Sequence, residues 1–97
     1  MDDFVQAFFF IEGLKDYVVI CLSNQKIITG VNLKTIYEQL PKKQFARISK
    51  SYIVNTEQII SFDVFNVYLA NVELLLGMSF KDDFLKDYVD GKVMKKG

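Results

Sequence analysis

Residues 45–55 read FARISKSYIVN, and this stretch decides the fold that the sequence predicts. Two apolar runs flank a short polar segment, Ser49–Ser51, which contains one cation and two hydroxyl groups. A buried strand has no place for three consecutive polar residues, because each would need a hydrogen-bond partner in the core. We therefore expect this segment, called the central loop below, to face outward at a bend. Its apolar neighbours should be largely buried: Phe45, Ile48, Tyr52, Ile53 and Val54.

Length and composition indicate one soluble, strand-rich domain. The chain has 97 residues, enough for a single core, and 51% of them are hydrophobic, so disorder is not expected. Phe, Tyr, Val and Ile dominate this set, which favours strands. The single cysteine, Cys21, excludes an intrachain disulfide and lies in an apolar run, which favours a buried thiol in a reduced, cytoplasmic setting. No run approaches the ~20 apolar residues of a membrane span.

Charge gives two opposing indications. Twelve basic and twelve acidic residues cancel, whereas domains that bind nucleic acid usually carry a basic excess. The distribution is uneven, because Glu38 is the only acid between Lys26 and Lys50, where the sequence has six cations. This run would allow a basic face on a neutral protein.

Hydrophobic periodicity predicts a mostly β domain with two short helices. The first helix should begin after Asn32 as N-cap and stop at Pro41. The second should begin after Ser79 as N-cap, with Asp82 completing a capping box, and end at Gly91. Strands are expected over residues 4–11, 17–22, 26–29, 45–55, 58–62, 65–69 and 72–76.

Residues for catalysis are lacking. The chain has no His that could activate Cys21 as a nucleophile. Asp82 and Asp83 could suggest acid–base chemistry or a metal site, but a place in the first turn of a helix, where the macrodipole favours negative charge, explains them structurally. No P-loop, dinucleotide fingerprint or nucleophile elbow occurs. We expect no enzyme activity, no cofactor and no metal.

The run at residues 45–55 closely resembles the signature of the LytTR family, the DNA-binding output domain of many bacterial response regulators. That signature is roughly Phe-x-Arg-Val-His-Arg-Ser-Tyr-Ile-Val-Asn. Ser49 stands where the family usually has His, and Lys50 where it often has Arg. Ile11-Glu12 with Tyr17-Val18 is similar to an early family element, and residues 32–41 are similar to its helix. Residues 74–81 match the closing family segment only loosely.

The resemblance implies a fold and a function. The fold would be an elongated domain of packed antiparallel sheets with little helix, as a single domain over residues 1–97. Family members normally carry another strand before the position of Asp2, so this domain is expected to lack its first strand. The family inserts loops into major grooves of double-stranded DNA, as homodimers on direct repeats. It acts in two-component transcription regulation, behind a receiver domain or sensor kinase that these residues do not include.

The resemblance also implies which residues meet DNA. They would lie in three segments: Gly13–Asp16, Ser49-Lys50 in the central loop, and Met78–Lys81. The site residues are Lys15, Asp16, Arg47, Ser49, Lys50, Ser79 and Lys81. Lysine at a loop tip can meet phosphate or guanine, and a serine hydroxyl can donate or accept at a base edge, although each lysine taken alone is an ordinary solvated charge.

Two of these candidates, and Asn55 beside them, also have structural interpretations. Asp16 repels phosphate and should weaken the first segment. Arg47 could hold a phosphate, or pair with Asp63 or Glu57. Asn55 is expected to form a turn rather than a contact. A second function also stays open: a protein-interaction or oligomerisation module that kept the fold and lost its DNA contacts, as the neutral charge and Ser49 in place of His would favour.

Overall fold

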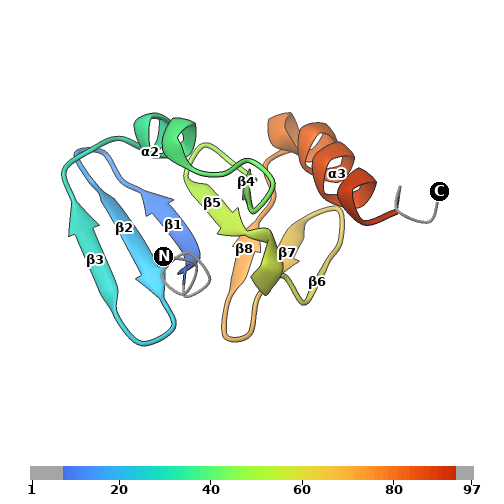
Figure 1. Cartoon of the computed structure of the whole chain (residues 1–97), viewed down its shortest axis with the longest axis horizontal. Coiled ribbons are helices and arrows are strands. Elements are labelled where there is room, and N and C mark those ends of the chain that lie inside the picture. The colour runs from blue at the N-terminus through green and yellow to red at the C-terminus, as the bar shows by residue number, and fades with distance from the viewer. Residues whose placement is uncertain (1–7, 94–97) are drawn as a thin grey trace.

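The computed structural model describes residues 8–93 and shows two antiparallel sheets with two α-helices (Figure 1). One sheet has five strands in the order β3-β2-β1-β5-β4, and the other has three in the order β6-β7-β8. The strands are β1 (Phe8–Gly13), β2 (Val18–Leu22), β3 (Lys26–Thr29), β4 (Phe45–Arg47), β5 (Tyr52–Asn55), β6 (Ser61–Phe62), β7 (Asn66–Tyr68) and β8 (Glu73–Leu75). The helices are α2 (Leu33–Gln39) and α3 (Met78–Val93), with a 3₁₀ turn η1 (Thr56–Gln58). The predicted mostly β class is confirmed, and the molecule is elongated, at 41 × 30 × 26 Å.

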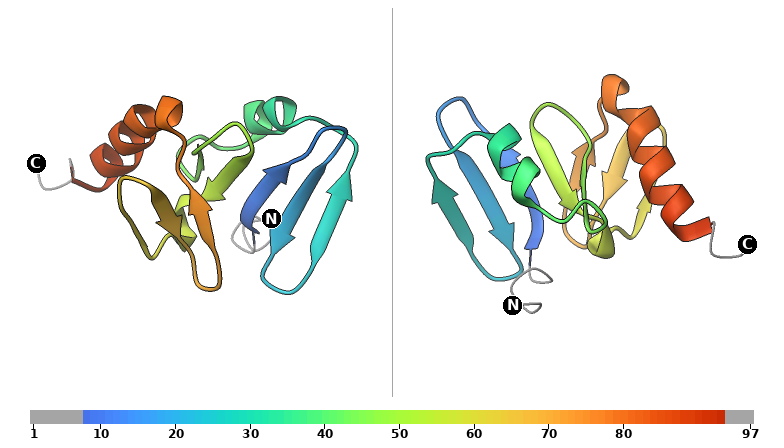
Figure 2. Two further views of the ribbon diagram at one scale, coloured as in Figure 1. Left: turned by 180° about the vertical axis from the view of Figure 1, so that it is seen from behind. Right: turned by 45° about the horizontal axis from the view of Figure 1, so that its top comes forward.

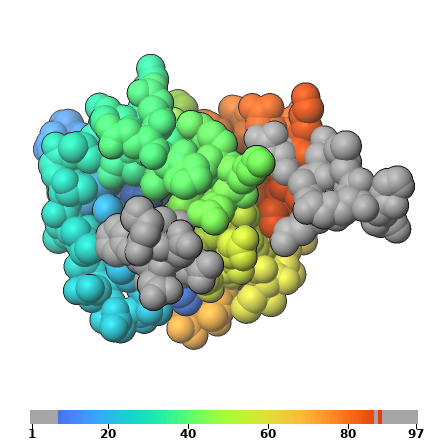
Figure 3. Space-filling model, in the orientation of Figure 1, coloured from blue at the N-terminus to red at the C-terminus, as the bar shows by residue number. Residues whose placement is uncertain are grey.

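The five-stranded sheet forms the middle layer. On one face it buries a cluster beneath α2: Phe8, Ile11, Val18, Leu33, Phe45 and Ile53. On the other face it packs against the three-stranded sheet and α3 through a second cluster: Ala46, Ile48, Val54, Val67, Leu69, Leu74, Leu76 and Phe84. In the space-filling view, the green segment that includes α2 lies between the cyan strands and the orange α3 (Figure 3). β4 and β5 each contribute side chains to both clusters, so both strands of the signature run are packed on both of their faces.

The signature run forms a hairpin. β4 and β5 pair antiparallel, with Phe45 opposite Asn55 and Arg47 opposite Ile53, so the central loop is the turn between them. Ile48 and Ile53 are fully buried, and Tyr52 is half-buried. The predicted bend is therefore confirmed, and so is the burial of Phe45, Ile48, Ile53 and Val54, whereas Ser49 and Tyr52 are each half-buried. The run is two strands rather than one, because the polar residues interrupt the ladder.

The first helix and the hairpin before it follow the prediction. The Asn32 side chain accepts a hydrogen bond from the backbone N–H of Thr35 at 2.8 Å, as an N-cap does. The helix ends at Gln39, and Pro41 follows, as expected. β2 and β3 pair antiparallel, closed by the Leu22 N–H donating to the Gln25 carbonyl at 2.9 Å.

Of the predicted strands, only residues 26–29 keep their bounds; β2, β7 and β8 are one or two residues shorter than predicted, and β1 and β6 differ more. β1 continues through Glu12 to Gly13, because these residues keep their partners Val19 and Val18 in the ladder with β2. The part of the predicted strand before Phe8 lies outside the described residues. The predicted strand over residues 58–62 shrinks to β6, since Asn55 starts a 3₁₀ turn ahead of it. The Asn55 side chain accepts from the Glu57 N–H at 2.9 Å and donates to the Phe8 carbonyl at 2.9 Å, which confirms its turn-forming role.

The predicted ends of the second helix are wrong. α3 begins at Met78, so Ser79 lies within the first turn and is not the N-cap. The first turn consequently contains no acidic residue, and Asp82 and Asp83 follow it, which removes the macrodipole explanation for them. The helix also continues through Gly91 to Val93, because a single glycine costs a helix only about 1 kcal/mol.

Cys21 is buried at 7% exposure, as predicted, and burial raises the pKa of its thiol. Within residues 8–93, neither helix has the length and apolar character needed to cross a bilayer.

Candidate nucleic-acid interface

Two short backbone hydrogen bonds bring the three predicted segments together. The Gly13 N–H donates to the Ser51 carbonyl at 2.7 Å, and the Gly77 N–H donates to the Ile48 carbonyl at 2.7 Å. The central loop is therefore held at its last residue by the end of β1, and the residue just before it is held by Gly77, which precedes α3. The right-hand view of Figure 2 shows the β1–β2 loop, the β4–β5 turn and the start of α3 along one border of the molecule.

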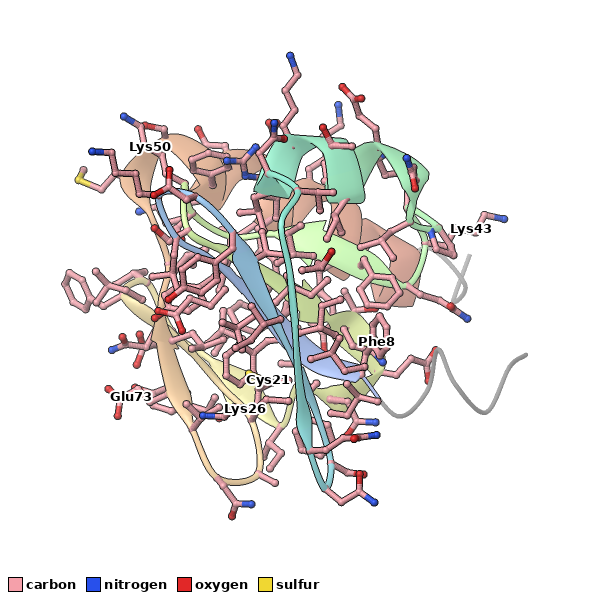
Figure 4. The ribbon with its side chains drawn as sticks, turned by 90° about the vertical axis from the view of Figure 1, so that its left-hand side faces the viewer. Phe8, Cys21, Lys26, Lys43, Lys50 and Glu73 are labelled. Carbon is pink, nitrogen blue, oxygen red and sulfur yellow. The ribbon has the colours of Figure 1, made fainter. Side chains whose placement is uncertain are left out.

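The central loop is ordered by its own serine. The Ser49 Oγ accepts hydrogen bonds from the N–H groups of Ser51 and Tyr52, both at 3.1 Å. The Ile48 N–H donates to the Tyr52 carbonyl at 3.0 Å and closes the turn. Because the hydroxyl oxygen serves as an acceptor here, its hydrogen can still donate to an outside group. Lys50 is exposed, and Figure 4 shows it at an upper edge of the molecule.

Arg47 braces the central loop. Its Nε donates to the Ser49 carbonyl at 3.1 Å, and its Nη2 donates to the Lys50 carbonyl at 3.0 Å. Its Cζ lies 5.3 Å from the centroid of the Phe80 ring in α3, within the range of a cation–π contact. Arg47 thus links β4, the central loop and α3.

The alternative pairing of Arg47 with Asp63 is not formed in the structure. Asp63 instead accepts hydrogen bonds from Phe65 N–H, Asn66 N–H and the Tyr68 hydroxyl, at 2.7, 2.8 and 2.7 Å. The Tyr68 hydrogen bond is the main reason that the pKa of Asp63 is lowered.

Each segment contributes one lysine to this border. Lys15 and Lys50 are exposed and Lys81 is half-buried, while Asp16 is exposed beside Lys15. Ser79 is exposed in the first turn of α3. All seven residues predicted from the sequence therefore lie in or directly beside the three linked segments: Lys15, Asp16, Arg47, Ser49, Lys50, Ser79 and Lys81.

The basic run between Lys26 and Lys50 does not form one face. Figure 4 shows Lys26, Lys43 and Lys50 at separate places on the molecule. Lys42 lies over the Tyr37 ring, with its Nζ 4.6 Å from the ring centroid. These three lysines therefore do not form the basic face that the run would allow, because one lies in β3, one after α2 and one in the central loop.

Two apolar residues of the predicted segments were not among the predicted site residues. Met78 is 87% exposed and Leu14 is 42% exposed. Each directly follows one of the glycines whose N–H holds the central loop. In the sequence, each is a large apolar residue that directly follows a glycine at a predicted loop or strand end. Hydrophobic periodicity does not show whether such a residue is buried or exposed.

A groove of about 220 Å³ lies beside the border, between α2, β4 and α3, and it shares two side chains with the loop brace. Its lining residues are Tyr37, Ala46, Arg47, Phe80, Asp83 and Phe84. Over the described part of the chain, no three His, Cys, Asp or Glu residues gather in a way that could hold a metal ion.

Comparisons with known proteins show the family and the fold of this chain. The family model for the LytTr DNA-binding domain matches residues 5–86. Among solved structures, the fold is similar to the LytTr DNA-binding domain of a Bacillus cereus protein described as a methyl-accepting/DNA response regulator. That domain is 18% identical, with a TM-score of 0.78, and the match covers 86% of this chain and 82% of that chain. A comparison with curated protein sequences gives no match. Because the family model spans most of its length, this chain belongs to the LytTR DNA-binding domain family.

Proposed function

We propose that the chain binds double-stranded DNA through the border formed by the β1–β2 loop, the central loop and the start of α3. The observation that carries the proposal is the pair of 2.7 Å hydrogen bonds from Gly13 and Gly77, which hold three loop segments as one surface. Loops that are fixed to each other can enter a groove together without a large ordering cost. Family membership supports DNA as the ligand.

Each segment has a distinct role in this proposal. Lys15, Lys50 and Lys81 supply the cations that meet phosphates or guanine acceptors. Ser49 and Ser79 supply hydroxyl groups at base or phosphate edges. The start of α3, where Met78 and Ser79 are exposed, adds their backbone N–H groups, since a helix start favours phosphate. Asp16 opposes phosphate and limits the first segment to a minor part.

Arg47 acts through the central loop. Its guanidinium already donates to two loop carbonyls, so its main contribution is to fix the direction of Lys50. Within residues 8–93, the Nη1 of Arg47 makes no hydrogen bond, so this nitrogen could still donate to a phosphate. We therefore assign Arg47 as a positioning residue.

The proposal extends to the assembly on DNA. The central loop would enter one major groove, and a homodimer on direct repeats would place two copies on the duplex. The chain would then be the output domain of a bacterial two-component transcriptional regulator in the cytoplasm, controlled by a receiver domain or sensor kinase. It is proposed as a binding domain rather than an enzyme.

A titration with mixed-sequence duplexes at several salt concentrations tests the proposal. With three lysines near phosphates, the slope of log affinity against log salt should be about −3. Lys50→Ala should bring the slope closer to zero by about one unit, because it removes one phosphate neighbour. The matched control is Lys43→Ala, which removes an exposed lysine at a different place on the molecule. If wild type shows no binding at low salt, the proposal fails.

A protein-interaction module is the second candidate. It is favoured by the zero net charge and by two exposed apolar residues in the β6–β7 turn, Val64 at 56% and Phe65 at 69% exposure. The same titration separates the two, because this candidate predicts no salt-dependent affinity for duplex DNA. Sedimentation of the free chain would then show self-association that Phe65→Ser removes.

A further inference from the structure

Two apolar side chains border the central loop, one on each neighbouring segment. Met78, in the first turn of α3, and Leu14, in the β1–β2 loop, are 87% and 42% exposed. An exposed apolar residue is common on a protein surface and needs no explanation by itself. These two differ because Gly77 and Gly13 fix their backbones to opposite ends of one polar loop.

Neither side chain can bind the phosphates or guanine acceptors that the lysines would bind. Met78 and Leu14 carry no charge and no hydrogen-bond donor, so they gain nothing from phosphate. In the major groove, most exposed base atoms are hydrogen-bond donors or acceptors, and the apolar group is the 5-methyl of thymine. Methionine suits such a target, because its unbranched thioether chain adapts to an irregular apolar surface.

We propose that Met78 and Leu14 contact thymine 5-methyl groups, and that the preferred DNA sites of this chain carry thymines on both sides of the base pairs met by Lys50. This inference rests on the proposed function, because it needs the same border in the major groove. It adds a source of sequence preference. Lysine contacts to phosphate act on every sequence alike, and the Ser49 hydroxyl can donate or accept, so it discriminates weakly among bases.

Deoxyuridine gives a direct test, because it lacks only the 5-methyl group of thymidine. A pool of random duplexes would first be enriched on the full chain, and one enriched duplex would be resynthesised. Each of its thymidines would then be replaced in turn by deoxyuridine, and each duplex titrated at one salt concentration. Replacement at a contacted position should weaken binding by a factor of about four, which corresponds to about 0.8 kcal/mol for one buried methyl-sized group.

Variants assign the effect to a side chain. In Met78→Ser, one thymidine position should lose its sensitivity to deoxyuridine, and in Leu14→Ser a different position should. Met78→Leu should keep the sensitivity, since it keeps an apolar side chain. Ile60→Ser is the matched control: Ile60 is 69% exposed, and its N–H donates to the Tyr68 carbonyl, at the end of the three-stranded sheet away from Gly77.

The possible outcomes separate this inference from the proposed function. Binding to DNA with equal affinity for the thymidine and deoxyuridine duplexes at every position overturns the inference and leaves the proposed function intact. Sensitivity that persists in both serine variants also overturns it, because the methyl effect would then lie elsewhere. A changed sedimentation mass of Met78→Ser with unchanged sensitivity would assign Met78 to a contact between copies instead. Absence of binding to any duplex at low salt refutes both.

Discussion

Replacing Arg47 by lysine separates its charge from its geometry. The substitution keeps one positive charge in β4, so a role as a simple phosphate contact would survive. Lysine lacks the planar fork that lets Nε and Nη2 reach two carbonyls at once. The bonds at 3.1 and 3.0 Å to Ser49 and Lys50 would therefore not both be kept.

The structure gives the size of the loss. Arg47 is half-buried, so each hydrogen bond to a loop carbonyl is worth about 0.5–1.5 kcal/mol rather than the larger value of a buried charge. Losing most of two bonds and part of the contact with Phe80 should reduce the free energy of unfolding by about 1–3 kcal/mol. A loosened central loop should weaken DNA binding roughly 5- to 30-fold, since about 1–2 kcal/mol is then needed to order it.

Three measurements check this reasoning: urea unfolding, duplex titration at several salt concentrations, and the same titration in a Lys50→Ala background. Arg47→Lys should lower stability and affinity while the salt slope changes little. Its effect on affinity should shrink when Lys50 is already absent, because the two residues act through one loop. If Arg47→Lys keeps affinity within about twofold of wild type, while Arg47→Met brings the slope about one unit closer to zero, the guanidinium is an ordinary phosphate contact and the brace is irrelevant.

Three further outcomes are expected. Ser49→His should tighten DNA binding in a duplex titration, because its ring nitrogen reaches further than the serine hydroxyl; unchanged affinity would contradict this expectation. It should also lower the free energy of unfolding in urea by about 1 kcal/mol, because the Ser51 and Tyr52 N–H groups lose their acceptor. Ile53→Ala should cost about 2–5 kcal/mol by leaving a cavity at a fully buried position, whereas the exposed Ile60→Ala should stay within about 0.5 kcal/mol in the same unfolding experiment. The hydrogen bond from Tyr68 and those from two backbone N–H groups lower the pKa of Asp63 from 3.8. The ionised carboxylate therefore stabilises the fold above about pH 4, and this stabilisation is lost as the pH falls through the pKa of the folded state. Asp63→Asn should accordingly be less stable than wild type at pH 6, with the difference shrinking towards pH 3; an equal difference at both pH values would refute the linkage.

The sequence predicted those elements whose signals are local. Asn32 and Pro41 bounded α2 correctly, because an N-cap side chain and a missing N–H act within a few residues. The bend at the central loop was also predictable, since Ser49–Ser51 could not be buried. The start of α3 was not predictable, because Ser79 is a good N-cap by type. The backbone of Gly77 is instead held by the Ile48 carbonyl, a partner nearly thirty residues away in the chain.

For the candidate site, too, the sequence predicted the residues but not how they are arranged in space. Its residues followed from a family signature, but their convergence depends on tertiary hydrogen bonds that no spacing in the sequence reveals. The role of Arg47 is the clearest case. The sequence suggested a phosphate contact or an ion pair with Asp63 or Glu57, whereas the turn at the central loop brings two carbonyls within reach of its guanidinium.

The two hydrogen bonds that hold the central loop are made by glycine N–H groups and main-chain carbonyls. Neither depends on the identity of any exposed side chain at Leu14, Lys15, Lys50 or Met78. The glycines themselves are constrained, since a Cβ would come 3.1 Å from the Leu33 Cβ at Gly13 and 3.3 Å from the Ser49 Cβ at Gly77. Mutation can therefore exchange the groups offered to a ligand while the frame that carries them stays constant. In such a scaffold, single substitutions at these exposed positions can change which DNA sequence is preferred, while each variant along the way still folds.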